Sequence, residues 1–411
     1  MTPQDSVSSC SLLLEPVDKP FALQATPRVT FGHGTVDTVA ECVRELGTTA
    51  AVITGSHSLA ASGVWERLDA AFSAEGVTIH HFPFSGEPSP AGIDQLRQEL
   101  CGCGINVVVS IGGGSVLDCG KALAAMLGQD VHLPTQDFVE GVGKRLHPGS
   151  TLPHVAVPTT AGTGSESSAN AVLSVIGPAG FKRSLRHPSF VPSRAIIDPQ
   201  LHLSLPPDTS SFCALDALTQ LLEAFVSPRS NPFVDTVCIN GLGQCAQSLM
   251  AVSTTQGDNP DHRAAMAWAA YLSGIALTNA GLGVVHGLAS LLGALVPIPH
   301  GVVCATLVAE ATRLVITRLE HDAAPQAQRY RARYAEAGRI LGLRERCSVG
   351  EGCALLIGTL DAWTQRLAIA RLSAFGITES DLHTIAAQAD PKNTPVPLSS
   401  AELFEMLLRR L

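Results

Sequence analysis

An aspartate and two histidines stand in surroundings that predict one buried metal site. Asp216 belongs to the segment ALDALTQLLE at 214–223, His286 follows GLGVV, and His300 follows PIP. Carboxylate oxygens and imidazole nitrogens are ordinary ligands of divalent ions. The surrounding chain is rich in alanine and leucine, where a carboxylate without a partner would be costly to bury. We therefore predict that the three side chains meet at one polar centre, assembled from three places in the chain.

The segment around Asp216 has the pattern of a helix. Asp216 and Gln220 are four residues apart and so share a helix face, with Glu223 one turn further along it. The face that carries Asp216 should therefore carry the other polar groups of this helix.

The two histidines can meet only if the helix between them breaks. They are fourteen residues apart, roughly 21 Å along an unbroken helix, which is too far to share one ion. Pro297 and Pro299 supply the break, because proline lacks an N–H and cannot continue a helix. The segment that starts at His300 can then turn back towards His286. The alternative is a hydrogen-bonded core histidine, which we accept for most of the fourteen histidines of the chain.

Two loops have the composition of a dinucleotide site. The apolar run 106–111 leads into Gly112, Gly113, Gly114 and Ser115, and a helical pattern with Asp118 follows. A strand, a glycine loop and a helix N-terminus bind phosphate through free N–H groups and the helix dipole. The spacing matches neither G-x-G-x-x-G nor the P-loop, and a tight turn between strand and helix is the plain alternative.

The second loop has the sequence PTTAGTGSE at 158–166 and follows the next strand pattern. Its hydroxyls and exposed amides, Ser165 included, could bind ribose, phosphate or a carboxamide at the ends of the strands.

The chain alternates β-branched runs with helical patterns in its first half and is helical in its second half. This order predicts a parallel sheet covered on both faces, followed by an all-α domain. The predicted strands are 50–54, 80–84, 106–111, 154–158, 171–176 and 194–197, and the predicted helices between them are 36–46, 64–74, 93–100 and 116–127. A polar loop with Lys182 and Arg183 is expected between the last two strands. The expected divisions are a flexible tail 1–27, an α/β domain 28–207 and a helical domain 208–411.

Composition narrows the class of function. A length of 411 residues favours two domains, and a net charge of −9 argues against nucleic acid or an anionic membrane as main partner. Eleven scattered cysteines, without a signal peptide or an apolar run of membrane-spanning length, predict reduced thiols and a cytoplasmic protein. A small-molecule enzyme fits these properties best.

Four motifs together resemble the iron-containing, or group III, alcohol dehydrogenase family. They are GGGSVLDCGKA at 112–122, PTTAGTGSE at 158–166, LDALTQLLEAFVSPRSNP at 215–232, and GLGVVHGLAS at 281–290 followed by PIPHG at 297–301. The resemblance implies the dehydroquinate synthase-like architecture, with an active site between a dinucleotide-binding α/β domain and a helical metal-binding domain. It also implies that the glycine loop holds the pyrophosphate and that Thr159, Thr160, Thr163 and Lys182 approach the cofactor. Asp216, His286 and His300 match the family's metal ligands.

The sequence departs from the family pattern at two site positions. Gln220 stands where the family usually has a histidine, and Ser290 stands where another histidine commonly faces the substrate. A glutamine oxygen can still bind a hard cation, though less well than imidazole binds Fe²⁺ or Zn²⁺. Gln220 is therefore a possible fourth ligand. Ser290 could relay a proton through water but cannot act as a base near neutral pH.

Gly55 bears on the choice of dinucleotide. Sites that prefer NAD often have an acidic residue at the end of the second strand, bonded to the adenosine ribose. Gly55 occupies that place here. NADP(H) is therefore allowed and slightly favoured over NAD(H).

The combined prediction is an NAD(P)-dependent enzyme that interconverts an alcohol and an aldehyde or ketone by hydride transfer, with Fe²⁺ or Zn²⁺ as Lewis acid. Alternatives are a metal-independent reductase of the maleylacetate type, a lyase or cyclase like dehydroquinate synthase, and a nucleotide-binding protein without catalysis. The resemblance also implies a homo-oligomer, such as a dimer. The substrate cannot be deduced, because a fold does not determine its chemistry.

Overall fold

The computed structural model describes residues 20–56, 59, 62–254 and 258–411. The predicted tail 1–27 lies largely outside these residues, and within its described part residues 20–27 have no regular secondary structure. The last strand of the sheet ends at Ile197 and the first long helix of the second half begins at Pro207. The boundary between the two domains at residues 207 and 208 stays a prediction. It falls at the first residue of this helix.

The described part of the first half forms a parallel sheet of six strands in the order β1-β8-β5-β4-β2-β3. Its strands are β1 Arg28–Phe31, β2 Thr49–Gly55, β3 Thr78–Phe84, β4 Val107–Gly112, β5 His154–Pro158 and β8 Arg194–Ile197. β4 and β5 are buried throughout, as expected for central strands covered on both faces. The predicted parallel sheet is confirmed, and β1 is an edge strand that was not predicted.

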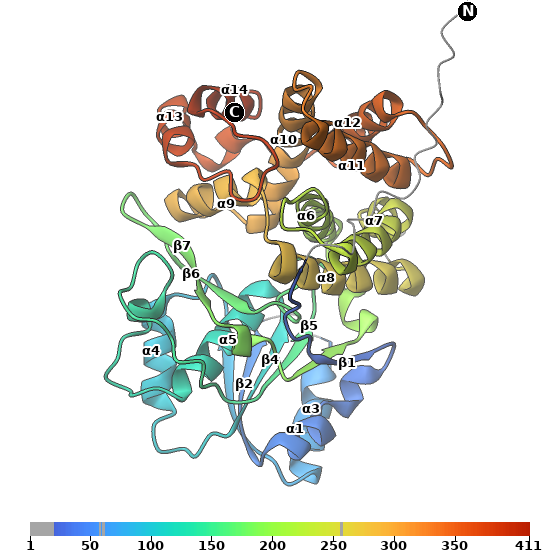
Figure 1. The fold of residues 1–411 in the computed structure, drawn as a ribbon. Coiled ribbons are helices and arrows are strands. Elements are labelled where there is room, and N and C mark those ends of the chain that lie inside the picture. The colour runs from blue at the N-terminus through green and yellow to red at the C-terminus, as the bar shows by residue number, and fades with distance from the viewer. Residues whose placement is uncertain (1–19, 57–58, 60–61, 255–257) are drawn as a thin grey trace, which may run out of the picture.

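Helices cover both faces of the sheet (Figure 1). α1 Val39–Leu46 and α3 Val64–Ala74 pack on one face, where Val39 and Phe72 meet Val109 of β4. α4 Pro90–Glu99 and α5 Gly114–Leu127 pack on the other, where Ile93 and Leu123 meet Val108. Successive residues of β4 therefore point into opposite cores, as the period of a strand requires.

A two-stranded antiparallel ribbon interrupts the α/β pattern and corrects one prediction. β6 Asn170–Val175 pairs with β7 Phe181–Arg186, so Lys182 and Arg183 lie in a strand and not in a loop. β7 has the sequence FKRSLR, with too few apolar residues for its pattern to be recognised. Its backbone is satisfied by pairing with β6, so a strand forms despite the polar composition. The ribbon reaches the helical part, where Gly177 N donates to Ala294 O at 2.9 Å (Figure 1).

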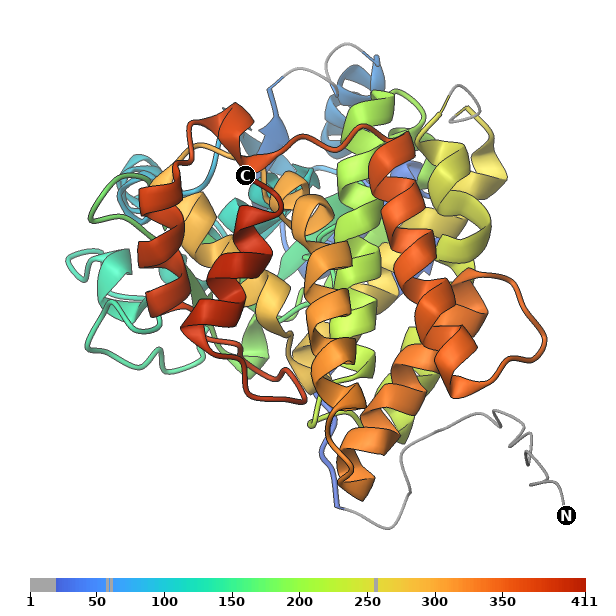
Figure 2. The ribbon, with the colours of Figure 1, turned by 90° about the horizontal axis from the view of Figure 1, so that it is seen from above.

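The second half is helical, as predicted. Its helices are α6 Pro207–Phe225, α7 Pro232–Val252, α8 Pro260–Ala280, α9 Val284–Leu295, α10 His300–Glu320, α11 Pro325–Leu341, α12 Val349–Arg366, α13 Glu379–Gln388 and α14 Ser400–Leu408. They form two cores, one around α6, α7 and α8 and one around α9, α13 and α14, with α10 contributing to both. Figure 2 shows the yellow-green α6 and the orange α10 running side by side.

The connection between α9 and α10 has the predicted break. α9 ends at Leu295 and α10 begins at His300, with Pro297 and Pro299 between them. No single helix of the described residues is long and apolar enough to span a membrane. The bent pair α8 and α9, which meets that test only jointly at an angle of 101°, contributes buried side chains to the two helical cores.

Candidate active site

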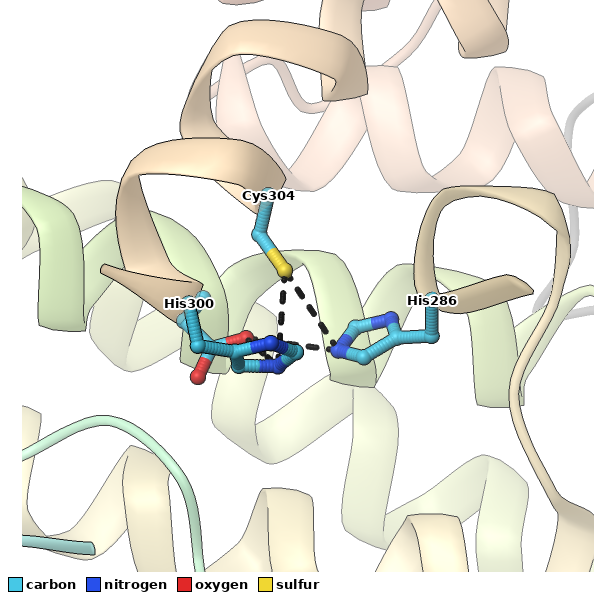
Figure 3. Close-up of side chains that lie close together, drawn as sticks. His286, His300 and Cys304 are labelled. Atoms are coloured by element: carbon cyan, nitrogen blue, oxygen red, sulfur yellow. Dashed lines mark hydrogen bonds and ion pairs between the residues drawn. The ribbon is translucent and has the colours of Figure 1, made fainter. Parts of the chain in front are cut away.

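Four potential metal ligands from three helices converge in the helical part. Asp216 lies in the middle of α6, His286 in the first turn of α9, His300 at the start of α10, and Cys304 one turn further along α10. Their donor atoms all lie within 4.8 Å of one another. Figure 3 shows the Cys304 thiol and both imidazole rings pointing to a common point. The predicted meeting of Asp216 with the two histidines is thus present, and Cys304 is an addition to it.

The spacing of these donors fits a tetrahedral ion. Asp216 Oδ1 lies 3.3 Å from His286 Nε2 and 3.7 Å from His300 Nε2. Cys304 Sγ lies 3.7 Å from each of the same nitrogens. Ligands at about 2.0–2.3 Å around a tetrahedral Zn²⁺ are themselves about 3.3–3.6 Å apart. The donor set and its spacing therefore fit a divalent metal.

Glu223 fixes the orientation of the His286 ring. Its Oε2 lies 2.7 Å from His286 Nδ1 and also accepts a hydrogen bond from Gly283 N at 2.9 Å. Its Oε1 accepts from Val285 N at 2.7 Å. These contacts place Nδ1 as the donor towards Glu223, so loss of the Nε2 proton would free the Nε2 lone pair for a metal ion. A carboxylate behind a histidine is a common arrangement at metal sites, where it fixes the tautomer of the ligand.

The charges of the cluster are mutually dependent. Burial raises the pKa of Asp216, but His300 and His286 outweigh this and bring the pKa down to about 2. Burial lowers the pKa of His300 to about 4 and raises that of the Cys304 thiol to about 12. For His286, burial lowers the pKa, yet Cys304 and Glu223 raise it well above its ordinary value. Asp216 is therefore a carboxylate at neutral pH, and His300 is a neutral imidazole.

The two departures from the family pattern have definite partners. Gln220 is buried, and its Oε1 accepts a hydrogen bond from Ser273 Oγ at 2.8 Å. Ser290 Oγ donates to His286 O at 3.0 Å. Both side chains line the same cavity as His286 and His300. Gln220 as a metal ligand and Ser290 as a proton relay both stay predictions.

The glycine loop and the threonine loop pack directly against each other at the carboxyl ends of β4 and β5. A Cβ atom at Gly114 would lie 2.5 Å from Thr163 Cγ2, and one at Gly113 would lie 3.3 Å from Thr160 Cγ2. Glycine is thus required at 114 by this close approach. Thr159 N donates to Gly112 O at 2.9 Å, which ties the second loop to the first.

The sheet topology places the glycine loop, which follows β4, beside the point where the strand order reverses. The chain leaves β2 towards β3 on one side and leaves β4 towards β5 on the other, so the loops after β2 and β4 diverge. Ligands of open α/β sheets bind at such a switch point. Gly55 ends β2 and Gly113 begins the loop after β4, next to the start of α5.

Asp118 and Ser165 hold the two loops together. Ser165 Oγ donates to Asp118 Oδ1 at 2.5 Å, and Val172 N donates to Asp118 Oδ2 at 3.0 Å. Lys121 Nζ donates to Ser165 O at 2.7 Å and lies 3.9 Å from Asp118 Oδ1. Both predicted cofactor residues therefore have structural partners in addition to facing the cavity.

One cavity joins the loops to the two histidines of the candidate metal site. It has a volume of about 460 Å³ and is lined by Gly114, Ser115, Asp118, Thr163, Ser165 and Lys182 of the predicted cofactor set. His286, His300, Gln220 and Ser290 line it as well. Gly55, Gly113, Thr159 and Thr160 are not among its lining residues. Lys182 is buried, and its Nζ donates to Glu87 Oε2 at 3.0 Å.

Three residues at the site were not assigned a role from the sequence. Cys304 follows His300 by four residues and so shares its helix face, a spacing that could have identified it. Glu223 was placed on the helix face of Asp216, but its contact with His286 depends on how α6 and α9 pack. Lys392 also reaches the site, from the segment between α13 and α14, and donates to His286 O at 3.2 Å.

Comparisons with known proteins agree with this geometry. The family model described as iron-containing alcohol dehydrogenase matches residues 26–199, and the model of the C-terminal part of the Fe-containing alcohol dehydrogenase family matches residues 211–410. The probable alcohol dehydrogenase EutG of Escherichia coli K12 is 31% identical over 327 residues, 77% of this chain and 76% of the relative. The NAD-dependent methanol dehydrogenase of Bacillus methanolicus is 29% identical over 286 residues, 67% of this chain and 71% of the relative. The solved alcohol dehydrogenase from Oenococcus oeni is 25% identical with a TM-score of 0.81, covering 95% of this chain and 100% of that one.

Proposed function

The chain belongs to the iron-containing alcohol dehydrogenase family, and from this premise we propose that its cavity interconverts an alcohol and an aldehyde or ketone by hydride transfer to or from NAD(P). The observation that supports this most is the single cavity lined by the glycine and threonine loops and by His286 and His300. Such a cavity can hold a nicotinamide ring against a substrate carbonyl. Proximity of the two reacting carbons accounts for a large share of catalysis in such a site.

Within this site we propose a division of roles among the residues of the chain. The amides of Gly113, Gly114 and Ser115 bind the pyrophosphate at the N-terminus of α5. Asp216, His286 and His300 hold a divalent metal, and Glu223 keeps His286 in the tautomer that binds it. A bound Fe²⁺ or Zn²⁺ supplies a Lewis acid that polarises a carbonyl and lowers the pKa of an alcohol. The protein's part is to hold and orient these groups in a buried site.

We propose that Cys304, and not Gln220, is the fourth ligand. Cys304 Sγ lies 3.7 Å from both histidine nitrogens, close enough for all three donors to hold one ion. The Gln220 oxygen is already bonded to Ser273. His286 and His300 line the cavity, whereas Asp216 and Cys304 are not among its lining residues. A substrate oxygen would therefore approach from the histidine side and would bind as a further ligand beside the four of the protein. A thiolate also shifts the preference of the site towards Zn²⁺ relative to an all-nitrogen and oxygen set.

Cobalt substitution tests the Cys304 assignment without relying on turnover. Wild-type protein loaded with Co²⁺ is expected to show a near-ultraviolet thiolate-to-cobalt charge-transfer band. Cys304→Ala is expected to lose the band and to bind metal about 10- to 100-fold more weakly, whereas Gln220→Ala keeps the band. Cys245→Ala, which removes a buried thiol from α7, is the matched control. A band that persists in Cys304→Ala would contradict the assignment.

For the dinucleotide we propose that both NAD(H) and NADP(H) bind, with NADP(H) slightly favoured. Gly55 ends β2 without a carboxylate to repel a 2′-phosphate. The ratio of kcat/KM for NADPH and NADH measures this directly. A cytoplasmic location and a homo-oligomer are also part of the proposal.

The proposed reaction is tested by following NADH and NADPH oxidation with an aldehyde panel, before and after metal removal. We expect near-stoichiometric iron or zinc in protein purified without chelator, with activity lost on stripping and restored by the ion. Full activity without metal would favour the metal-independent reductase. Dinucleotide binding without any turnover would favour a non-catalytic protein.

A further inference from the structure

Basic side chains from three separate elements line the cavity. β7 contributes three, the turn between α6 and α7 one, and the segment between α13 and α14 one: Lys182, Arg183, Arg186, Arg229 and Lys392. Lys182 belongs to the predicted cofactor set, and a neutral substrate requires none of the other four charges for hydride transfer. The proposed reaction therefore assigns no role to these four basic residues.

The acidic side chains that line the cavity already have partners. Glu87 pairs with Lys182 at 3.0 Å, and Asp118 accepts hydrogen bonds from Ser165 and Val172. Neither carboxylate forms an ion pair with the other basic residues of the cavity.

The remaining basic side chains are weakly compensated. Arg186 lies 3.5 Å from Glu140, but both side chains are about half exposed, and such surface pairs contribute little. Within the described residues, Arg183, Arg229 and Lys392 form no ion pair with a carboxylate. The cavity thus holds an excess of positive charge.

Lys392 connects this charge to the metal site. Its Nζ donates to the backbone oxygen of His286 at 3.2 Å. Arg183 and Arg186 line the same cavity as Lys392, and the carboxylates of Glu223 and Asp390 also act on the charge of Lys392. An anion in the cavity can accept charge-assisted hydrogen bonds from these basic groups.

The backbone at Lys392 is held in one conformation by hydrogen bonds. Its φ is 52°, in the left-handed region that favours glycine. Asp390 Oδ1 accepts from Lys392 N at 2.8 Å, and Asn393 N donates to Leu282 O at 3.1 Å, which together hold this conformation. The backbone therefore fixes the place from which the Lys392 side chain enters the cavity.

We propose that Arg183, Arg186 and Lys392 bind an oxyanion on the substrate, so that the enzyme acts on short aldehydes or alcohols bearing a carboxylate or phosphonate. Guanidinium groups bind such oxyanions through two parallel hydrogen bonds. Because Lys392 Nζ contacts the backbone oxygen of His286, an anion bound to Lys392 would lie near His286, which favours a short chain between the anion and the carbonyl. This inference rests on the proposed function, because the reacting group is the carbonyl or alcohol at His286 and His300.

Pairs of aldehydes matched in size test the inference on the holoenzyme. 4-Oxobutanoate is compared with butanal, and 2-oxoethylphosphonate with propanal, each with NADH. We expect the anionic member of at least one pair to have a kcat/KM at least about 100-fold higher, from two or more charge-assisted hydrogen bonds. The pair with the larger ratio identifies the anion as carboxylate or phosphonate.

Variants separate substrate binding from cofactor binding. Lys392→Met and Arg183→Met are each expected to lower kcat/KM for the anionic aldehyde by about 10- to 100-fold and that for its neutral partner by less than about threefold. Lys392→Arg should retain most of the preference. Arg366→Met, at an exposed position in the last turn of α12, is the control for loss of a positive charge.

Three results would overturn the inference. The first is equal kcat/KM for both members of each pair. The second is an equal loss of kcat/KM with every aldehyde in Lys392→Met. The third is a rise in KM for NADH in the variants with butanal as substrate, which would assign the basic group to the cofactor.

If no aldehyde is reduced, the proposed function fails. Calorimetric binding of 4-hydroxybutanoate and 2-hydroxyethylphosphonate to the NAD⁺-loaded protein then tests the anion site. Binding of either that Lys392→Met weakens would support the anion site, and no binding of either would refute it.

Discussion

Replacing Asp216 with asparagine is expected to lower kcat/KM by about 10³-fold or more while dinucleotide affinity changes by less than about twofold. Asp216 is the proposed carboxylate ligand; the two histidines hold its pKa low, and its exposed fraction is 1%. An amide of the same shape keeps the packing of α6 but removes the charge that a divalent ion requires. Steady-state kinetics, metal content and NADH binding by fluorescence measure the three effects separately.

Asp208→Asn is the matched control, because Asp208 lies in the first turn of the same helix and is exposed. It should leave all three quantities unchanged. If Asp216→Asn lost dinucleotide binding and activity to the same extent, with a lower free energy of unfolding, Asp216 would have a folding role. The metal assignment would then be wrong.

The sheet could be predicted because its central strands are continuous apolar runs. Strands such as β4 and β5 are buried on both faces, so local composition alone identifies them. β1 and β7 were missed because each depends on its partner strand. β1 is an exposed edge strand that pairs with β8, and β7 is a polar strand that pairs with β6. Pairing across the chain is not encoded in the composition of either segment.

The cluster proposed to hold a metal was predictable where local rules position its residues. Asp216 and Gln220 share a helix face, and the prolines between α9 and α10 dictate that His300 can turn back towards His286. Lys392 could not be predicted, since it reaches His286 from 106 residues further along the chain. Such a contact depends on how α13 and the segment after it pack on α9.

Lys121→Met is expected to lower the free energy of unfolding by about 3–5 kcal/mol, as is typical when one partner of a buried charged network is removed. Lys121 is 1% exposed, and its Nζ donates to Ser165 O, Asn170 O and the hydroxyls of Ser165 and Ser168, at 2.7 to 3.1 Å. Methionine fills the same space but leaves these acceptors and Asp118 without their donor. Denaturant unfolding with matched m-values measures the loss.

The same substitution should also weaken dinucleotide binding, because Lys121 ties the threonine loop to the helix that follows the glycine loop. Lys144→Met removes an exposed lysine from the same domain and is expected to change the free energy of unfolding by less than about 0.5 kcal/mol. Unchanged stability of Lys121→Met with weaker NADH binding would mean that Lys121 acts on the cofactor directly. If Lys121 holds the two loops in place, Lys121→Met should lower both the free energy of unfolding and NADH binding. Binding should then recover at low temperature or at high NADH concentration, where the folded state is favoured.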